Sequence, residues 1–221
     1  MQKEADGIIA LMENKKQEII SGITFTKGTL CQKEVVIAVC GIGKVFAAMC
    51  TQTMILKYKP DIIINEGVAG ALAPDLNIFD IAVATDLVQH DMDTTALGDE
   101  KGLISGINIV KIPTDIVLTH QAKVAVKRAG FNYKEGTIVS GDQFIASEEK
   151  KWELVKTFGA IACEMEGAAV AQVCYVNNVR FIVIRAISDG ANNTADISYP
   201  EFLEKATKNA VEVIKELVEV I

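Results

Sequence analysis

Residues 34–70 read EVVIAVCGIGKVFAAMCTQTMILKYKPDIIINEGVAG, and this stretch decides the fold class. An apolar run that ends at Cys40 predicts a buried strand, and apolar residues at helical spacing from Val45 to Tyr58 predict a helix after it. A Pro-Asp pair stops that helix before a second apolar strand, Ile62–Ile64. The stretch therefore predicts a β-α-β unit.

The same alternation extends in both directions along the chain. Upstream, Ile8, Leu11 and Met12 are spaced as on a short helix, and residues 22–40 suggest a hairpin of two strands. Because strands and helices alternate, we expect an α/β fold with a mixed, partly parallel central sheet flanked by helices. Downstream, strands are predicted near Ile81–Val88, Gly136–Ser140 and Phe181–Ile187. Helices are predicted near Asp115–Ala129, Ser147–Thr157 and Glu164–Val176. The capping box Ser198-Tyr199-Pro200-Glu201 predicts the start of a last helix.

Composition limits the function further. With 221 residues, half of them apolar, the chain is long enough for one domain, 1–221, and no apolar run reaches the length of a membrane span. The acidic start lacks the features of a secretory signal, so we expect a cytoplasmic protein. Five cysteines without a CxxC pair read as reduced thiols, and with only His90 and His120 they offer no zinc ligand spacing. A net charge of −7 argues against nucleic acid and favours a small-molecule ligand.

Two acidic motifs are candidates for chemistry. The segment RAISDG at 185–190 follows an apolar strand, so Ser188 and Asp189 should emerge at its carboxyl end, where α/β sheets bind ligands. An ordinary turn explains this pattern about equally well. The segment EMEG at 164–167 begins a predicted helix, whose N-terminus favours ionised carboxylates. Exposed acids that compensate the helix dipole are the simpler explanation there.

Three glycine-bearing segments, 41–44, 65–70 and 140–145, each follow a predicted strand and would converge on one rim of the sheet. Each is weak alone, because none matches a phosphate-binding loop and tight structural turns are common. The segment HDMDTT at 90–95 fails the calcium-loop pattern. It is interpreted as a solvated loop or subunit contact, with His90 as a structural hydrogen-bonding residue.

As an ordered set, these motifs resemble those of the bacterial 5′-methylthioadenosine/S-adenosylhomocysteine nucleosidases, which have the purine nucleoside phosphorylase fold. The matching segments are CGIGK at 40–44, NEGVAG at 65–70, SGDQFI at 140–145, CEMEG at 163–167 and RAISD at 185–189, and they cover nearly the whole chain. The resemblance implies hydrolysis of 5′-methylthioadenosine and S-adenosylhomocysteine to adenine and the 5′-substituted ribose, with 5′-deoxyadenosine as a further candidate.

The resemblance also implies roles for residues. Asp189, oriented by Ser188, would protonate adenine N7, Glu166 would hold the ribose hydroxyls, and Glu4 would activate water. Arg185 would lie close to that water and the ribose. The implied substrate-binding residues are Phe144, which stacks on adenine, Ile145, Met165 beneath the ribose, Glu164, Ile42, Val68, Gly70 and Tyr199.

The same resemblance implies a homodimer in which a loop within residues 90–106 completes the neighbouring 5′ pocket. Met92, Leu97 and Leu103 are the apolar members of that loop. No cofactor is implied.

Two departures from the family pattern stand out. The family begins with a short strand before the segment that holds Glu4, and no such strand precedes Glu4 in this sequence. Either the start site has been assigned too far downstream, or this form lacks a core strand. We therefore expect a form extended by about eight residues to be more stable and more active. The second departure is Glu66, where the family has Thr, and its carboxylate either raises a neighbouring pKa or points to solvent.

Two alternative functions stay open at this point. A purine nucleoside phosphorylase would use phosphate in place of water, but the turn at 65–70 carries no cation and Glu4 would repel phosphate. A nucleoside-binding protein that lost catalysis together with its first strand would bind methylthioadenosine without releasing adenine.

Overall fold

The computed structural model describes residues 2–191 and 195–221, with side chains described except at positions 3, 4 and 195–201. The helices are α1 Gln2–Leu11, α2 Lys44–Tyr58, α3 Ile116–Arg128, α4 Glu148–Phe158, α5 Gly167–Asn177 and α6 Ala195–Val220, with a 3-10 turn η1 at Thr95–Leu97. The strands are β1 Glu13–Ile20, β2 Ile23–Leu30, β3 Lys33–Ala38, β4 Ile62–Ala71, β5 Ile81–Gln89, β6 Ile112–Pro113, β7 Tyr133–Ser140, β8 Ala160–Glu164 and β9 Arg180–Asp189.

The described strands form two sheets. The larger has the order β6-β5-β7-β8-β4-β9, and an additional pairing of β5 with β9 closes it into a ring. It is mixed, as expected, since β4–β9, β5–β7 and β7–β8 pair in parallel, whereas β4–β8 and β5–β9 are antiparallel. The smaller sheet, β1-β2-β3, is antiparallel.

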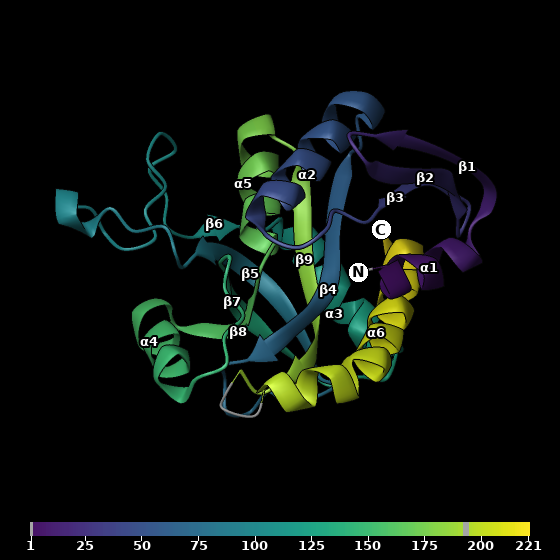
Figure 1. Ribbon diagram of the computed structural model, residues 1–221. Helices are drawn as coiled ribbons and strands as arrows, with labels where there is room; N and C mark the ends of the chain where they lie inside the picture. The colour runs from purple at the N-terminus through teal and green to yellow at the C-terminus, as the bar shows by residue number, and fades with distance from the viewer. Residues whose placement is uncertain (1, 192–194) are drawn as a thin grey trace.

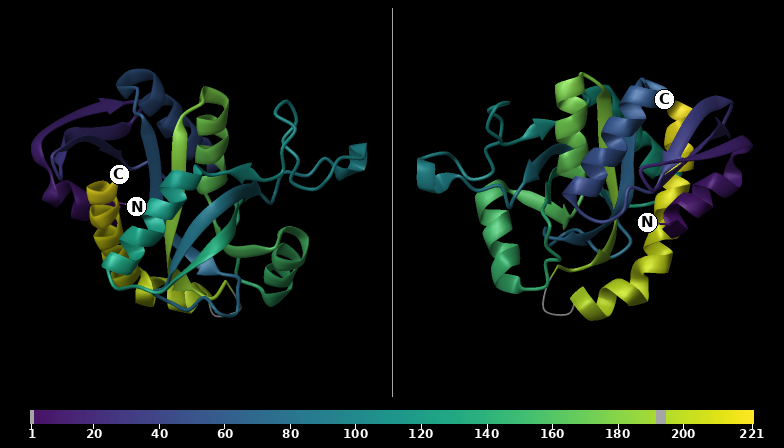
Figure 2. Two further views of the ribbon diagram at one scale, coloured as in Figure 1. Left: turned by 180° about the vertical axis from the view of Figure 1, so that it is seen from behind. Right: turned by 45° about the horizontal axis from the view of Figure 1, so that its top comes forward.

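Helices cover the central sheet on two sides (Figure 1). Residues of α2 and α5, such as Ala47 and Cys174, belong to one buried cluster with the sheet. Residues of α3 and α6, such as Leu118 and Leu217, belong to a second. Figure 2 shows that α3 and α6 lie behind the sheet when α2 and α5 are in front. No helix in the described part of the chain is both long and apolar enough to cross a membrane.

Local sequence explains where several helices begin. The carboxylate of Asp115 accepts the N–H groups of Val117 and Leu118, both at 2.9 Å, and so caps α3. The Ser147 hydroxyl accepts the N–H of Lys150 at 3.1 Å and caps α4. Helix α6 differs from the expectation, because it begins at Ala195 and includes the predicted capping box in its first two turns.

Two strand predictions were wrong. Strand β1 was not predicted, because its sequence ENKKQEII is charged and almost entirely exposed, and its pairing with β2 is what makes it a strand. The segment 65–70 is not a turn, because β4 continues through it to Ala71.

The carboxyl ends of four strands meet at one place. Strands β4 and β8 run toward each other and overlap only where Gly70 pairs with Cys163 and Ala71 with Ala162. Beside them, β9 runs parallel to β4 and β7 runs parallel to β8. The predicted convergence of strand ends on one rim is therefore confirmed for β4 and β7, and the ends of β8 and β9, which carry Glu164 and Asp189, lie there on either side of β4.

Candidate active site

A pocket of about 360 Å³ lies at this junction of strand ends. The segments 40–42, 65–70, 143–145 and 163–166 line it, together with the end of β9. Most of the residues proposed from the sequence are thus brought together: Ile42, Val68, Gly70, Phe144, Ile145, Glu164, Met165, Glu166, Arg185, Ser188 and Asp189. The side chains of Glu4, in α1, and Tyr199, in α6, lie outside the described part of the structure.

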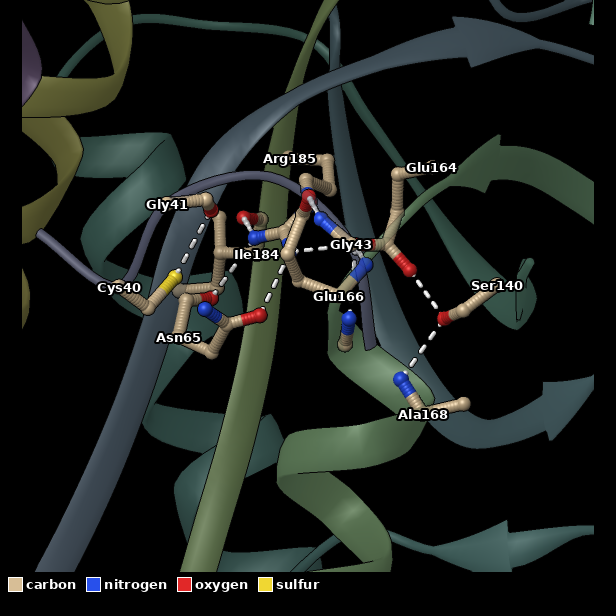
Figure 3. A network of polar contacts seen from close by, with 11 residues as sticks. Cys40, Gly41, Gly43, Asn65, Ser140, Glu164, Glu166, Ala168, Ile184 and Arg185 are labelled. Carbon is tan, nitrogen blue, oxygen red and sulfur yellow. Dashed lines mark hydrogen bonds and ion pairs between the residues drawn. The ribbon is translucent and has the colours of Figure 1, made fainter. Parts of the chain in front are cut away.

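The pocket floor is built on a buried ion pair between Arg185 and Glu164 (Figure 3). The guanidinium Nη2 lies 2.6 Å from Glu164 Oε2, and each side chain is only 2% exposed. Arg185 also donates to the Asn65 side-chain oxygen at 2.5 Å and to two backbone carbonyls. Arg185 is therefore held by protein groups on β4, β8 and β9.

The side chain of Glu164, at the end of β8, binds the free N–H groups at the start of α5. Its Oε2 accepts the N–H groups of Glu166 and Gly167 at 2.9 and 2.8 Å, and its Oε1 accepts the Ser140 hydroxyl. Ser140 Oγ in turn accepts the N–H of Ala168 at 2.7 Å. Burial by itself would raise the pKa of Glu164, but the charge of Arg185 and these hydrogen bonds hold it below its usual value. Both oxygens of Glu164 are occupied by protein donors, so this residue shapes the site through its neighbours.

Glu166 lies at the N-cap position of α5 and faces the turn after β3. Its Oε1 accepts the N–H of Gly43 at 2.8 Å. Burial and the charge of Glu164 raise its pKa, against the opposing effects of Arg185 and the Gly43 N–H. The expectation that the helix N-terminus would favour the ionised form of Glu166 is therefore wrong in direction, because burial and a neighbouring carboxylate outweigh the helix.

Asp189 ends β9 and is 3% exposed. Its Oδ1 accepts the N–H of Ala191 at 2.8 Å, and its Oδ2 accepts the Ser188 hydroxyl at 3.0 Å. Burial raises its pKa, whereas those two hydrogen bonds and the charge of Lys151 lower it. A β-carbon added at Gly70 would lie 2.7 Å from Asp189 Oδ1, so only glycine leaves room for this carboxyl group.

A second polar cluster joins three segments around the pocket. Lys44 Nζ donates to Asp91 Oδ1 at 2.6 Å and to Gln89 at 3.1 Å. Asp91 Oδ2 accepts the N–H of Asp142 at 2.9 Å, and Asp142 Oδ1 accepts the N–H of Lys44 at 2.8 Å. This cluster of Lys44, Asp91 and Asp142 fixes the turn that holds Gly43 against the segment that carries Phe144.

The segment 90–95 is therefore not simply a solvated loop. His90 is 1% exposed, and neither ring nitrogen has a hydrogen-bond partner among the described residues. Within the described residues, the interpretation of His90 as a structural hydrogen-bonding residue is therefore wrong. The ring packs against Gly141, where an added β-carbon would lie 2.4 Å from Nε2. Burial lowers the pKa of His90.

The rest of the predicted loop projects away from the body of the protein, as the views in Figures 1 and 2 agree. Its 3-10 turn carries Leu97, which is 82% exposed, whereas Met92 and Leu103 are half-buried. At the mouth of the pocket, Ile42 and Phe144 are 67% and 49% exposed. Glu66 is half-buried and lines the pocket, so it does not simply point to solvent.

Sequence reasoning missed the residues that hold the site together. Asn65 and Ser140 open two of the recognised motifs, but their partners, Arg185 and Glu164, are distant along the chain. Asp91 was considered only as part of a rejected calcium loop and of a solvated loop or subunit contact. A polar residue whose hydrogen-bond partner lies in a distant segment shows no helical or strand spacing in the sequence that would reveal the contact.

Comparison with known proteins identifies relatives. The family model described as the phosphorylase superfamily matches residues 1–219. A 5′-methylthioadenosine/S-adenosylhomocysteine nucleosidase of Staphylococcus aureus is 41% identical over 215 residues, which are 95% of this chain and 94% of that protein. The crystal structure of the nucleosidase of the same name from Neisseria meningitidis, in complex with methylthio-immucillin-A, is 37% identical with a TM-score of 0.97 and covers 100% of this chain and 96% of its own.

A structure of futalosine hydrolase from Helicobacter pylori is also similar. It is 38% identical, has a TM-score of 0.96, and covers 100% of this chain and 95% of its own.

The cluster of Lys44, Asp91 and Asp142 yields a prediction. Asp91→Asn keeps the shape but offers one acceptor oxygen where two donors, Lys44 Nζ and the Asp142 N–H, must be satisfied. We expect a loss of about 1–3 kcal/mol in the free energy of unfolding, measured with urea, and faster amide exchange at Gly43 and Asp142. The control is Asp93→Asn in the same loop, which should stay within about 0.5 kcal/mol. Equal effects of the two substitutions would contradict this role for Asp91.

Proposed function

The chain belongs to the phosphorylase superfamily and, within it, to the 5′-methylthioadenosine/S-adenosylhomocysteine nucleosidases, which hydrolyse N-glycosyl bonds, and from this premise we propose how its residues carry the reaction. The observation that carries the proposal is the buried carboxyl of Asp189, whose pKa is raised, in the same pocket as Glu166.

Asp189 is the general acid that protonates adenine N7. Adenine is a poor leaving group until it is protonated, so the reaction needs a carboxylic acid that keeps its proton at higher pH than usual. Burial raises the pKa of Asp189 in this direction. The Ser188 hydroxyl donates to Asp189 Oδ2 and the Ala191 N–H donates to Oδ1, and these two contacts fix the plane of the carboxyl group. Activity then declines as pH rises through the pKa of Asp189.

Glu166 binds the ribose hydroxyls and stabilises positive charge that develops on the sugar. One of its oxygens is held by the Gly43 N–H, which leaves the other for the ligand. Burial and the charge of Glu164 raise the pKa of Glu166. Hydrogen bonds donated by the ribose hydroxyls would lower this pKa again, because they favour the ionised form of the carboxyl group. Arg185 and Glu164 act as positioning residues, since their ion pair fixes the N-terminus of α5 on which Glu166 lies.

The remaining roles follow the family pattern. Glu4 is proposed as the base that activates water, and Tyr199 as a residue near the base or the 5′ side. Phe144 stacks on adenine and Ile145 contacts it, and both line the pocket. Met165 packs beneath the ribose.

The electrostatics of the pocket favour water over phosphate as the nucleophile. Among the described residues that line it, Arg185 is the only cationic side chain, and its guanidinium is paired with Glu164. The nearby Lys44 and Lys151 donate to Asp91 and to the carbonyl of Gly190. A phosphate dianion would therefore meet carboxylates without a cation positioned to bind it.

We propose a homodimer in which the projecting loop of one copy completes the 5′ pocket of the other. The exposed Leu97 on that loop and the exposed Ile42 and Phe144 at the pocket mouth support this arrangement. One family model spans residues 1–219, which supports a single nucleosidase domain over 1–221. The five cysteines are all free thiols, in keeping with the cytoplasm as the proposed compartment.

An adenine-release assay tests the reaction type. With 5′-methylthioadenosine and S-adenosylhomocysteine, we expect adenine and the free 5′-substituted ribose in phosphate-free buffer, with turnover unchanged by added phosphate. Strict dependence on phosphate would refute hydrolysis, and binding without adenine release would identify a catalytically impaired nucleoside-binding protein. The same assay with 5′-deoxyadenosine and futalosine measures the preference for the 5′ substituent.

Substitution of the two acids tests their roles. Asp189→Asn cannot donate a carboxylic proton, so turnover should fall by at least about 10²-fold while methylthio-immucillin-A still binds in a calorimetric titration. Glu166→Gln should weaken both turnover and binding, because the ribose contact serves both. Asp75→Asn, which alters an exposed aspartate paired with Lys134, is the matched control and should change neither. Retained turnover in Asp189→Asn would exclude it as the acid.

A further inference from the structure

The turn after β9 holds Asp189 in a backbone conformation that needs support. Ala191, two residues after Asp189, has a φ of 47°, in the left-handed region that residues other than glycine rarely adopt. Its N–H group donates to Asp189 Oδ1 at 2.8 Å, so the direction of the carboxyl group depends on this conformation. Such strain persists only where the surrounding structure holds it. The contacts that other elements make with this turn therefore decide where Asp189 lies.

One set of contacts with the turn is apolar. Ala191 is 0% exposed and belongs to a buried cluster that includes Ile145, Leu154 and Cys163. Ile145 lines the active-site pocket, and Leu154 lies on α4. The turn thus shares one buried cluster with the segment proposed to contact adenine and with the helix that follows this segment.

A second contact with the turn is polar and also comes from α4. Lys151 Nζ donates to the carbonyl oxygen of Gly190 at 2.8 Å. The backbone of Lys151 is fixed in the first turn of the helix, because its N–H donates to the Ser147 carbonyl at 3.0 Å and Ser147 caps α4. Lys151 is half-buried and is not among the residues that line the pocket. It therefore reaches the turn from outside the substrate site.

Helix α4 connects the two parts of the site that must meet at adenine. Residues 143–145 line the pocket, and α4 begins at Glu148, three residues later. The same helix packs on β7 and β8, and Lys151 extends from it to the turn that carries Asp189. Because a helix is a rigid element, the contact made by Lys151 sets the position of the acid relative to the segment that contacts the base.

The charge of Lys151 also acts on Asp189. Among the described residues, the titratable side chains coupled to Asp189 are Lys151 on α4 and Cys163 on β8. Burial and the charges of Asp189 and Glu164 raise the pKa of the Cys163 thiol, so this thiol stays neutral. Burial raises the pKa of Asp189, and the positive charge of Lys151 opposes this effect.

We propose that Lys151 is a positioning residue for the general acid: by holding the Gly190 carbonyl from α4, it sets Asp189 in register with the adenine-binding segment 143–145. This role rests on the proposed function, in which Asp189 gives its proton to adenine N7. In that step the O–H bond of Asp189 breaks as the N7–H bond forms, and negative charge develops on the carboxylate. The charge of Lys151 stabilises this carboxylate and so makes Asp189 a stronger acid.

Three variants test this role: Lys151→Met, Lys151→Arg and Lys156→Met. The first keeps the length of the side chain but removes its charge and its hydrogen-bond donor, and the second keeps both. The third removes a charge from an exposed position of the same helix. The measurements are the pH dependence of kcat/KM for 5′-methylthioadenosine, the pKa of the Asp189 carboxyl group by carbon-13 NMR, and amide exchange at Ala191.

In Lys151→Met we expect the pKa of Asp189 to rise, since a nearby positive charge is lost. Activity requires the protonated acid and is lost as pH rises through this pKa, so the alkaline limb of kcat/KM should move to higher pH with it. Turnover on the plateau should fall about tenfold with KM nearly unchanged, and amide exchange at Ala191 should become about tenfold faster. Lys151→Arg and Lys156→Met should match the unsubstituted chain.

No change in the limb, in the pKa of Asp189 or in Ala191 exchange in Lys151→Met would overturn the proposal and leave Asp189 as the acid. Equal changes in Lys151→Met and Lys156→Met would also overturn it, because any charge on α4 would then serve. A pKa of Asp189 that rises while the limb of kcat/KM stays in place would show that Asp189 is not the acid. In that case the proposed function fails, and the role of Lys151 fails with it.

Discussion

The site depends on a shortage of buried positive charge. Among the described residues, Arg185 is the only Lys or Arg side chain that is buried, while Glu164, Glu166 and Asp189 share its pocket. Arg185 pairs with Glu164, and the pKa of Glu164 falls accordingly. Burial then raises the pKa of both Glu166 and Asp189, because neither has a comparable cation. One ion pair thus lowers the pKa of one carboxyl group in the pocket, while the pKa of the other two is raised. Enzymes that cleave glycosidic bonds rely on carboxyl groups whose pKa values differ in this way.

The same pair organises the backbone. Glu164 caps α5 and so fixes Glu166, and Arg185 reaches Asn65 on β4. Breaking a buried pair by removing one partner typically costs about 3–5 kcal/mol, so the geometry of the pocket and the stability of the chain rest on the same contact.

Much of this could be predicted from the sequence, and the exceptions have physical reasons. Asp189 at a strand end and Glu166 beside a helix were found because strand-to-helix transitions are visible in apolar spacing. The glycines of 65–70 were misread as a turn. Gly70 is required instead because Asp189 packs onto it, with 2.7 Å to an added β-carbon, and a contact between different strands has no local signature. The direction of the Glu166 pKa shift was missed because it depends on Glu164 and on burial.

The proposed chemistry depends most directly on the protonation of Asp189. A titration of its side-chain carboxyl by carbon-13 NMR, in the chain without ligand, should give a pKa clearly above about 3.9, the ordinary value for aspartate. The same titration in Lys151→Ala should give a still higher pKa, because the charge of Lys151 lowers it. A pKa at or below the ordinary value would contradict the assignment of Asp189 as the general acid, since that role requires its carboxyl group to hold its proton at higher pH than usual.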